Sequence, residues 1–241
     1  MNNSYTSKKI SILMPTRLRP NQVSNCIDNI ISKVSNIENL EILLRMDEDD
    51  TETIDFLKEK YHKYLNRYIK IYVGERKKGY EDLSNFFYEL FEISTGEWMF
   101  CFNDDLMFET QDFDLPIISN NLGISILYGI GDNHNCNING GNWCFPIINR
   151  KIISTLEHFS VETPYIDGWM RLIGETLNLI KIIPIKLNHS PDNDMDQVSI
   201  EKTLINNKLK NKFDWTFHHH HGLIHEDILK LKKILELQSF R

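Results

Sequence analysis

The stretch Trp98-Met99-Phe100-Cys101-Phe102-Asn103-Asp104-Asp105 decides the fold class of this chain. Its first five residues are apolar, which is typical of a strand buried on both faces of a sheet. Comparable apolar runs occupy residues 10–15, 41–46 and 69–73, and a helical pattern separates each run from the next. Strands that alternate with helices predict an α/β fold with a mostly parallel sheet and helices on both faces.

The remaining elements are predicted from hydrophobic periodicity and from turn residues. Helices are expected at residues 21–34, 51–64, 82–93, 150–158 and 166–177. Further strands are expected at residues 124–128, 143–148 and 179–187, and Pro184 should interrupt the last one. Residues 129–142 are rich in Gly and Asn and should form a loop.

The chain is expected to have one α/β domain at residues 1–190 and a C-terminal helical extension at residues 191–241. The extension ends in an amphipathic helix, whose apolar positions include Ile224, Ile228, Leu231 and Leu235. This helix offers an apolar face for docking on a surface, such as the periphery of a membrane.

Composition excludes several classes of protein. With 27 Lys and Arg against 34 Asp and Glu, the 241-residue chain has a net charge of −7, which argues against a general nucleic-acid binder. No apolar run reaches the ~20 residues needed to span a bilayer. Residues 1–9 are polar, and no signal-peptide core follows them. The cysteines form no CxxC pair, so we expect reduced thiols and a cytoplasmic protein.

Acidic residues follow two of the predicted strands, at residues 47–50 and at Asp104-Asp105. In open parallel sheets, ligands bind beyond the carboxyl ends of the strands. Adjacent carboxylates at a buried strand end are costly unless a cation neutralises them, and Mg²⁺ or Mn²⁺ prefers oxygen ligands. An exposed acidic turn is the alternative interpretation. The basic turn Arg76-Lys77-Lys78 similarly has two interpretations, as a solvated turn or as a partner for a diphosphate.

From Lys9 to about Asp105, the chain resembles the GT-A glycosyltransferases, especially family 2. The resemblance rests on the order and spacing of several features: Met14-Pro15-Thr16-Arg17 at the end of the first strand, the acidic end of the second strand, Gly79, Asn85, Gly96-Glu97-Trp98 and the DxD-like Asn103-Asp104-Asp105. It implies a GT-A (Rossmann-like) fold, a nucleotide-diphosphate sugar as the donor substrate, and Mn²⁺ or Mg²⁺ as the cofactor. The chain departs from the family pattern at Asn103, which replaces an acidic residue, and at Ser84, where the family often has Arg.

The resemblance assigns a role to each matching position. The nucleotide pocket would be formed by Pro15, Thr16, Arg17, Asp47, Asn85, Asn103 and Asp104, with Asp47 at the base or ribose and Asp104 at the ribose or the metal shell. Asp105 would coordinate the metal, and His189 after the last strand would be a further ligand. A surface histidine is the alternative for His189.

A candidate general base follows in the second half of the chain. The segment 163–169 resembles the acidic "ED" segment of the family, with Ile166 in place of the Glu. Asp167 would remove the proton of the acceptor hydroxyl, since direct displacement at the anomeric carbon requires a base. Capping of the helix that begins here is an alternative role for Asp167.

These features lead to one hypothesis and two alternatives. The hypothesis is a metal-dependent glycosyltransferase of hexosyltransferase type that transfers a sugar from a nucleotide-sugar donor to an acceptor hydroxyl, with inversion. The alternatives are a sugar nucleotidyltransferase and a non-catalytic GT-A-like protein that binds a nucleotide or a glycan. The acceptor stays open among a glycan, a lipid carrier, a protein and a modified base, and so does the oligomeric state.

Overall fold

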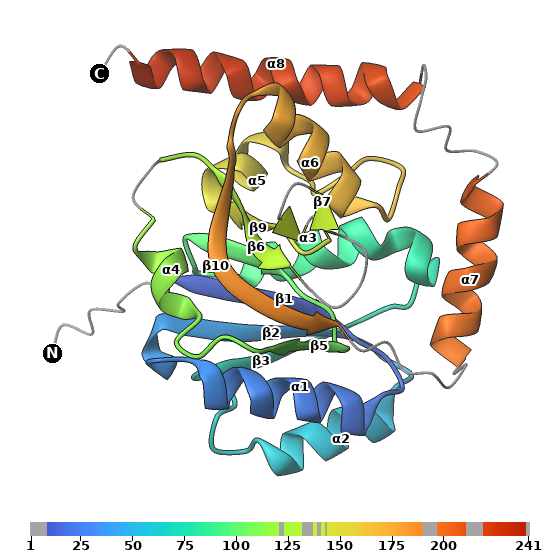
Figure 1. The fold of residues 1–241 in the computed structure, drawn as a ribbon. Coiled ribbons are helices and arrows are strands. Elements are labelled where there is room, and N and C mark those ends of the chain that lie inside the picture. The colour runs from blue at the N-terminus through green and yellow to red at the C-terminus, as the bar shows by residue number, and fades with distance from the viewer. Residues whose placement is uncertain are drawn as a thin grey trace, which may run out of the picture.

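The computed structural model describes residues 9–120, 123–131, 137–138, 141–142, 144–189, 197–210 and 219–239. A central sheet lies between layers of helices (Figure 1). In chain order the elements are β1 (Ile10–Pro15), α1 (Pro20–Lys33), η1 (Ile37–Asn39), β2 (Leu40–Asp47), α2 (Thr51–Lys60), β3 (Ile69–Gly74), η2 (Gly79–Asp82), α3 (Leu83–Ile93), β4 (Trp98–Cys101), β5 (Leu106–Phe108), α4 (Asp114–Ile118), β6 (Ile126–Gly131), β7 (Asn137–Ile138), β8 (Gly141–Asn142), β9 (Ile147–Asn149), α5 (Arg150–Leu156), α6 (Ile166–Thr176), β10 (Ile180–His189), α7 (Gln197–Lys210) and α8 (His219–Ser239).

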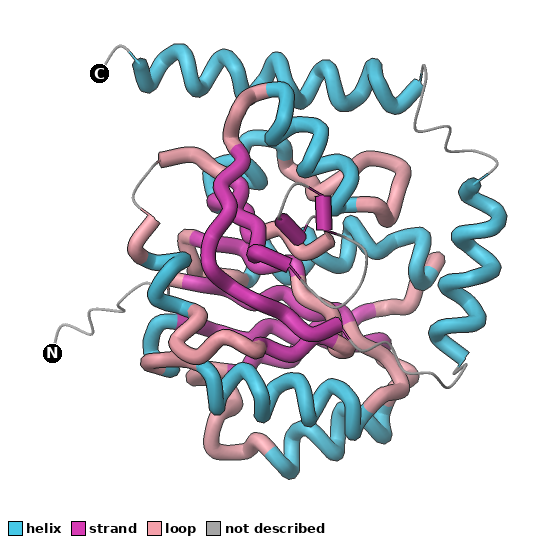
Figure 2. The backbone as a smooth tube through the Cα atoms, in the orientation of Figure 1, coloured by secondary structure: helices cyan, strands magenta, loops and turns pink. Residues whose placement is uncertain are grey.

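The main sheet has the strand order β3-β2-β1-β4-β9-β6-β10-β5. The strands β3, β2, β1 and β4 are parallel, and Leu13 of β1 lies opposite Leu43 of β2 and Cys101 of β4. Strand β9 runs antiparallel between β4 and β6, whereas β10 pairs in parallel with β6 and antiparallel with β5 (Figure 2). The predicted α/β fold with a mostly parallel sheet is confirmed.

Each face of the sheet has its own hydrophobic core, because successive side chains of a strand point to opposite faces. Ile10, Ile12 and Met14 of β1 belong to the core beneath α1, α2 and α4, whereas Leu13 belongs to the core beneath α3, α5 and α6. This double burial explains why the strands have continuous apolar sequences.

Local sequence accounts for the ends of several helices. Helix α1 begins at Pro20, which has no backbone N–H to leave unpaired in the first turn. Asp50 caps α2 by accepting a hydrogen bond from the Thr53 N–H at 3.3 Å. Asn149 likewise caps α5 and accepts from the Lys151 N–H.

Two predictions about the second half of the chain are corrected, and three elements of the chain were not predicted. Strand β10 continues through Pro184 with a shift of register between Ile183 and Lys186, so the proline occupies a bulge and does not end the strand. The strand expected at 143–148 is shorter and spans Ile147–Asn149, and Trp143 lies outside the described residues. The short elements β5 and α4, and helix α7, were not predicted.

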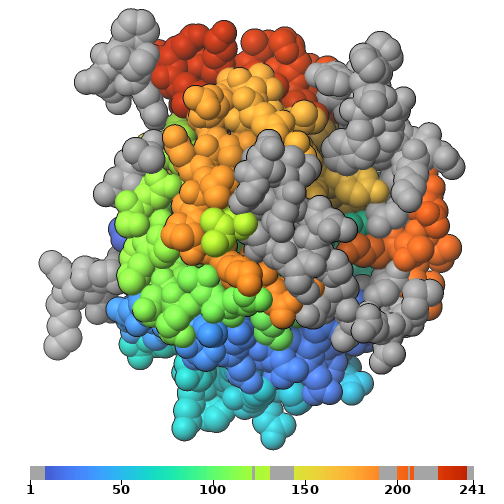
Figure 3. Space-filling model, in the orientation of Figure 1, coloured from blue at the N-terminus to red at the C-terminus, as the bar shows by residue number. Residues whose placement is uncertain are grey.

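The amphipathic C-terminal helix is part of the second core. Ile224 and Leu231 of α8 are buried against α5 and α6, and Ile228 and Leu235 pack beside them. In space-filling view, α8 lies directly on the segment that contains α6 (Figure 3). The face that we expected to dock on a surface is therefore occupied within the molecule. No helix among the described residues is long and apolar enough to cross a membrane.

The cysteines differ from the expectation in one respect. Cys26 and Cys101 are buried free thiols. Cys144, however, is disulfide-bonded. Disulfides are rare in the cytosol, so cysteine usage gives no support to a cytoplasmic location, which stays a prediction.

Candidate functional site

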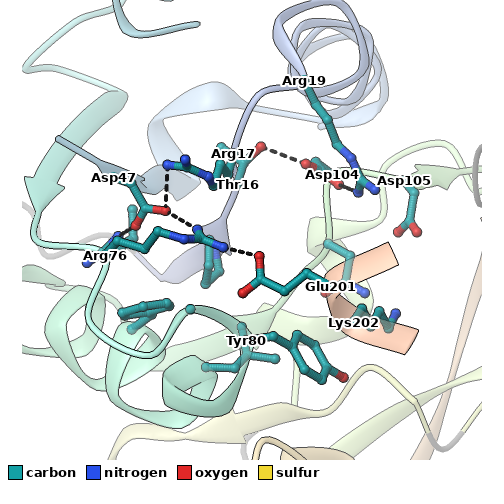
Figure 4. A pocket seen from close by; sticks show the side chains of 16 residues that line it. Thr16, Arg17, Arg19, Asp47, Arg76, Tyr80, Asp104, Asp105, Glu201 and Lys202 are labelled. Carbon is teal, nitrogen blue, oxygen red and sulfur yellow. Dashed lines mark hydrogen bonds and ion pairs between the residues drawn. The ribbon is translucent and has the colours of Figure 1, made fainter. Parts of the chain in front are cut away.

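The parallel strands β1, β2 and β4 end at one edge of the sheet, and a cavity opens beyond that edge (Figure 4). Its lining includes the expected residues Pro15, Thr16, Arg17, Asp47, Asn103, Asp104 and Asp105. These residues are separated by up to 90 positions in the sequence, and the parallel register of the strands brings them together. The cavity lies where ligands bind in open α/β sheets.

Asp47, at the end of β2, is the centre of an arginine cluster. Its side chain is only 4% exposed and pairs with Arg17 at 3.0 Å, with Arg76 at 2.6 Å and with Arg45. Arg45 is itself buried, with 1% of its side chain exposed, and also pairs with Glu89 at 3.1 Å. The Asp47 carboxylate thus orients the guanidinium groups of these three arginines along one wall of the cavity. From the sequence, Arg45 was assigned only to a strand and was not predicted as a site residue. For Arg76, the sequence left open whether the side chain is solvated or pairs with a diphosphate.

Asp104 is held by polar side chains from the end of β1 and the start of α1. Its Oδ2 accepts a hydrogen bond from the Thr16 hydroxyl at 2.6 Å, and its Oδ1 lies 3.3 Å from both Arg19 Nη1 and Gln22 Nε2. Burial raises the pKa of Asp104 to about 6, although Arg19 and Thr16 oppose this increase. Arg19 was also missed, because it lies in the loop between β1 and α1 without a recognisable motif.

Asp105 lines the cavity and pairs with His189, which is not among the lining residues. Asp105 directly precedes β5 and His189 ends β10, and Asp105 Oδ2 lies 3.1 Å from His189 Nε2. Burial alone would raise the pKa of Asp105, but the hydrogen bond and charge of His189, with Lys202 and Arg19, lower it. Within the described residues, Asp105 Oδ1 is buried without a hydrogen-bond partner. A carboxylate oxygen of this kind is suited to a cation.

Asp167 lies in the first turn of α6. The N-cap of this helix is Tyr165, whose side chain makes no capping hydrogen bond. Burial raises the pKa of Asp167, against the opposing effects of the Gly168 backbone N–H and Lys202. Burial and the charge of Asp167 together raise the pKa of Tyr80, which lines the cavity, although Asp167 itself is not among the lining residues. Desolvation of this kind is common in general bases.

One expected residue lies elsewhere. Asn85 is on the exposed face of α3, where its amide donates a hydrogen bond to Asp82 at 3.2 Å. It does not line the cavity, because the helical period of α3 turns the neighbouring Leu83 and Phe86 toward it instead. Asn85 thus lies outside the cavity in this structure, and its assignment to the nucleotide pocket stays a prediction.

Two further residues enter the site from the C-terminal extension. Glu201 and Lys202 of α7 line the cavity, and Glu201 pairs with Arg76 (Figure 4). No sequence motif marks them, because their position depends on how α7 packs against η2.

Sequence comparison finds a family match within the first half of the chain. Residues 11–115 match the family model described as glycosyl transferase family 2. None of the curated proteins matches the chain in sequence.

The fold is similar to those of solved glycosyltransferase structures. One is S. aureus TarS 1-349, with a TM-score of 0.59 and 12% identity over 92% of this chain and 79% of that chain. Its complex with UDP has a TM-score of 0.60 and 12% identity, over 86% of this chain and 73% of that one. Another is the mannosyltransferase PcManGT from Pyrobaculum calidifontis in complex with GDP-Man and Mn²⁺, with a TM-score of 0.58 and 11% identity over 97% and 76% of the two chains.

These matches confirm the resemblance on which the sequence analysis relied. Residues 11–115 are similar in sequence to the family 2 glycosyl transferases, and the chain has the GT-A fold of the glycosyltransferases that it matches in structure.

Proposed function

We propose that this protein is a glycosyltransferase that transfers a sugar from a nucleotide-diphosphate donor to an acceptor hydroxyl. The observation that carries the proposal is the cavity at the carboxyl edge of the sheet, where an arginine cluster faces the acidic pair Asp104 and Asp105. The matched family and the nucleotide complexes of TarS and PcManGT support the same activity.

The cationic wall of the cavity is suited to a diphosphate. Arg17 and Arg76 would bind phosphate oxygens, because a guanidinium donates two parallel hydrogen bonds to such groups. Asp47, which both arginines contact, would hold them in position. Both oxygens of Asp47 already accept hydrogen bonds from arginines, so a direct contact of Asp47 with the base would require one arginine to move.

Asp105 and its partner His189 fit a divalent metal ion. They would hold Mn²⁺ or Mg²⁺, and the unpartnered Asp105 Oδ1 supports this assignment. Such an ion, when bound, supplies positive charge that stabilises a departing diphosphate. The described residues contain no group of three or more His, Cys, Asp or Glu side chains placed to bind a metal. Donor phosphates and water would therefore complete the coordination, as is common for Mg²⁺.

Asp167 is proposed as the general base. Its carboxylate would take the proton of the acceptor hydroxyl while the acceptor oxygen bonds to the anomeric carbon. The bond from that carbon to the diphosphate oxygen breaks, and its electron pair leaves with the diphosphate. Attack from the face opposite the leaving group inverts the anomeric configuration.

The first test is the thermal stability of the protein with UDP-, GDP-, TDP- and CMP-sugars at about 1 mM, with and without Mn²⁺. A donor at 100 times its Kd stabilises the folded state by about 2.7 kcal/mol, which raises the Tm of a chain of this size by roughly 5–10 °C. One nucleotide class should give a shift that increases with Mn²⁺, and Asp105→Ala should abolish the increase. No shift with any donor would refute the proposal.

A non-catalytic protein that binds a nucleotide or a glycan is the second candidate. Two observations favour it: Asn103 replaces an acidic residue of the family motif, and Asp47 is saturated by arginines. Donor hydrolysis in the absence of an acceptor separates the two candidates. An enzyme should release nucleoside diphosphate slowly, whereas a binding protein should retain the donor intact.

A further inference from the structure

Helix α7 covers one side of the proposed donor cavity, although it lies far outside the matched residues 11–115. It packs against η2, and Lys208 pairs with Glu81 of that turn at 2.6 Å. The free volume of the cavity is about 150 Å³, which is below the ~300–1,000 Å³ of most ligand pockets. Two side chains of α7, those of Glu201 and Lys202, line this small cavity.

The carboxylate of Glu201 occupies an anion site. It pairs with Arg76 Nη2, while Arg76 Nη1 binds Asp47 at 2.6 Å on the other side. It also lies directly against Gly79, where a Cβ atom would overlap Glu201 Oε1. Gly79 has a φ of +60°, so both its conformation and this contact favour glycine. The cavity side of Arg76 thus already accepts a negatively charged group.

Lys202 also lines the cavity, next to Glu201 on α7 (Figure 4). Its ammonium is 5.8 Å from the centroid of the Tyr80 ring, and within the described part of the chain no ion pair holds it. Its charge lowers the pKa of both Asp105 and Asp167. One cation therefore acts on the carboxylate proposed for the metal and on the carboxylate proposed for the base.

We propose that α7 completes the donor site, with Lys202 binding the diphosphate and Glu201 holding Arg76 until the phosphate of the donor replaces it. The proposal rests on the proposed function. When the bond from the anomeric carbon to the diphosphate breaks, negative charge increases on the phosphate oxygens, and a nearby ammonium stabilises that charge. Glu201 has the opposite effect, because its carboxylate competes with the phosphate for the same guanidinium.

Substitutions of the neighbouring residues Glu201 and Lys202 should thus change nucleotide affinity in opposite directions. The test measures the Kd of UDP and GDP for the full chain by titration calorimetry. Lys202→Gln should weaken binding roughly tenfold or more, as expected for the loss of a charge-assisted hydrogen bond. Glu201→Gln should tighten binding several-fold. Lys208→Gln removes the same charge from the same helix outside the cavity, and should change Kd less than about twofold.

Kinetics provide a second readout. Lys202→Gln should lower the rate of donor hydrolysis at saturating donor, and Lys202→Arg should restore part of it, because only the charge at this position is needed. Equal effects of Lys202→Gln and Lys208→Gln would overturn the inference. Weaker binding in Glu201→Gln would also overturn it, because it would indicate that Glu201 supports the site. A wild-type chain that binds no nucleotide would instead refute the proposed function itself.

Discussion

Asp47 is predicted to stabilise the folded protein before any ligand binds. In Asp47→Ala, the guanidinium of Arg45 would remain at 1% exposure with one carboxylate fewer beside it. Removing one partner of a buried ion pair costs about 3–5 kcal/mol. Each arginine keeps one acidic partner in this variant: Arg45 pairs with Glu89, Arg17 with Asp49, and Arg76 with Glu201. The expected loss of unfolding free energy is therefore near the lower end, about 3 kcal/mol.

Asp49→Ala provides a matched control, since Arg17 pairs with both aspartates. The side chain of Asp49 is 56% exposed, whereas that of Asp47 is 4% exposed. An exposed pair contributes at most about 1 kcal/mol. Urea unfolding followed by circular dichroism, without nucleotide, measures both variants, and Asp47→Ala should also lower Tm by roughly 6–12 °C. Equal losses for the two variants, both below about 1 kcal/mol, would refute the argument from burial.

Three further predictions concern other parts of the molecule. Because burial raises the pKa of Asp167, the rate of transfer should begin to fall with decreasing pH at a pH above the usual pKa range of an aspartate. Asp167→Asn should lower kcat by roughly 10²–10⁴ without weakening donor binding. Asp227→Ala should destabilise the protein by about 2 kcal/mol and reduce hydrogen-exchange protection of α8, because the buried Asp227 accepts a hydrogen bond from Trp169 Nε1 at 2.9 Å. Gly96→Ala should cost about 1–3 kcal/mol, because its Cβ would lie 2.6 Å from the backbone nitrogen of Ser11.

Each of these predictions has a control and a refuting result. For Asp167→Asn, the Kd of the donor is the control, and an unchanged kcat would exclude the base assignment. Glu226→Ala changes an exposed neighbour of Asp227, and equal losses in both variants would contradict anchoring of α8 by the buried carboxylate. Gly222→Ala adds a Cβ in open space on α8 and should be neutral or slightly stabilising. An equally neutral Gly96→Ala would show that β1 tolerates the added atom.

The four parallel strands and the helices between them could be predicted because local pattern and tertiary position agree. A strand buried on both faces needs an apolar residue at nearly every position, and β1, β2 and β4 have such sequences. The glycine of the Gly96-Glu97-Trp98 motif has a structural reason, since the Gly96 backbone approaches Ser11 too closely for a side chain. The antiparallel strand β5 was not predicted, because its three residues are too few for a periodic signal, and β9, also of three residues, was predicted with the wrong bounds.

The candidate site was predictable only where a residue lies at the carboxyl end of a strand or shortly after it. Asp47, Asp104 and Asp105 meet this condition, and the direction of the parallel strands places them at one edge. Asn85 does not meet it, because a position on a helix leaves the direction of the side chain to the packing of that helix. The pairing of Asp105 with His189 required β10 to run beside β5, which no local pattern encodes.

The sequence alone thus determined the α/β class, the carboxyl edge of the sheet as the place of the candidate site, and the acidic residues there, because these properties follow from strand direction and hydrophobic period. Only the tertiary structure decided the charge around those acids. Arg45, Arg76, Glu201 and Lys202 come from separate elements, and side-chain packing alone brings them to one cavity. The tertiary structure also decided that the apolar face of α8 covers α5 and α6. The sequence of an amphipathic helix shows that one face must be buried, but not which surface will bury it.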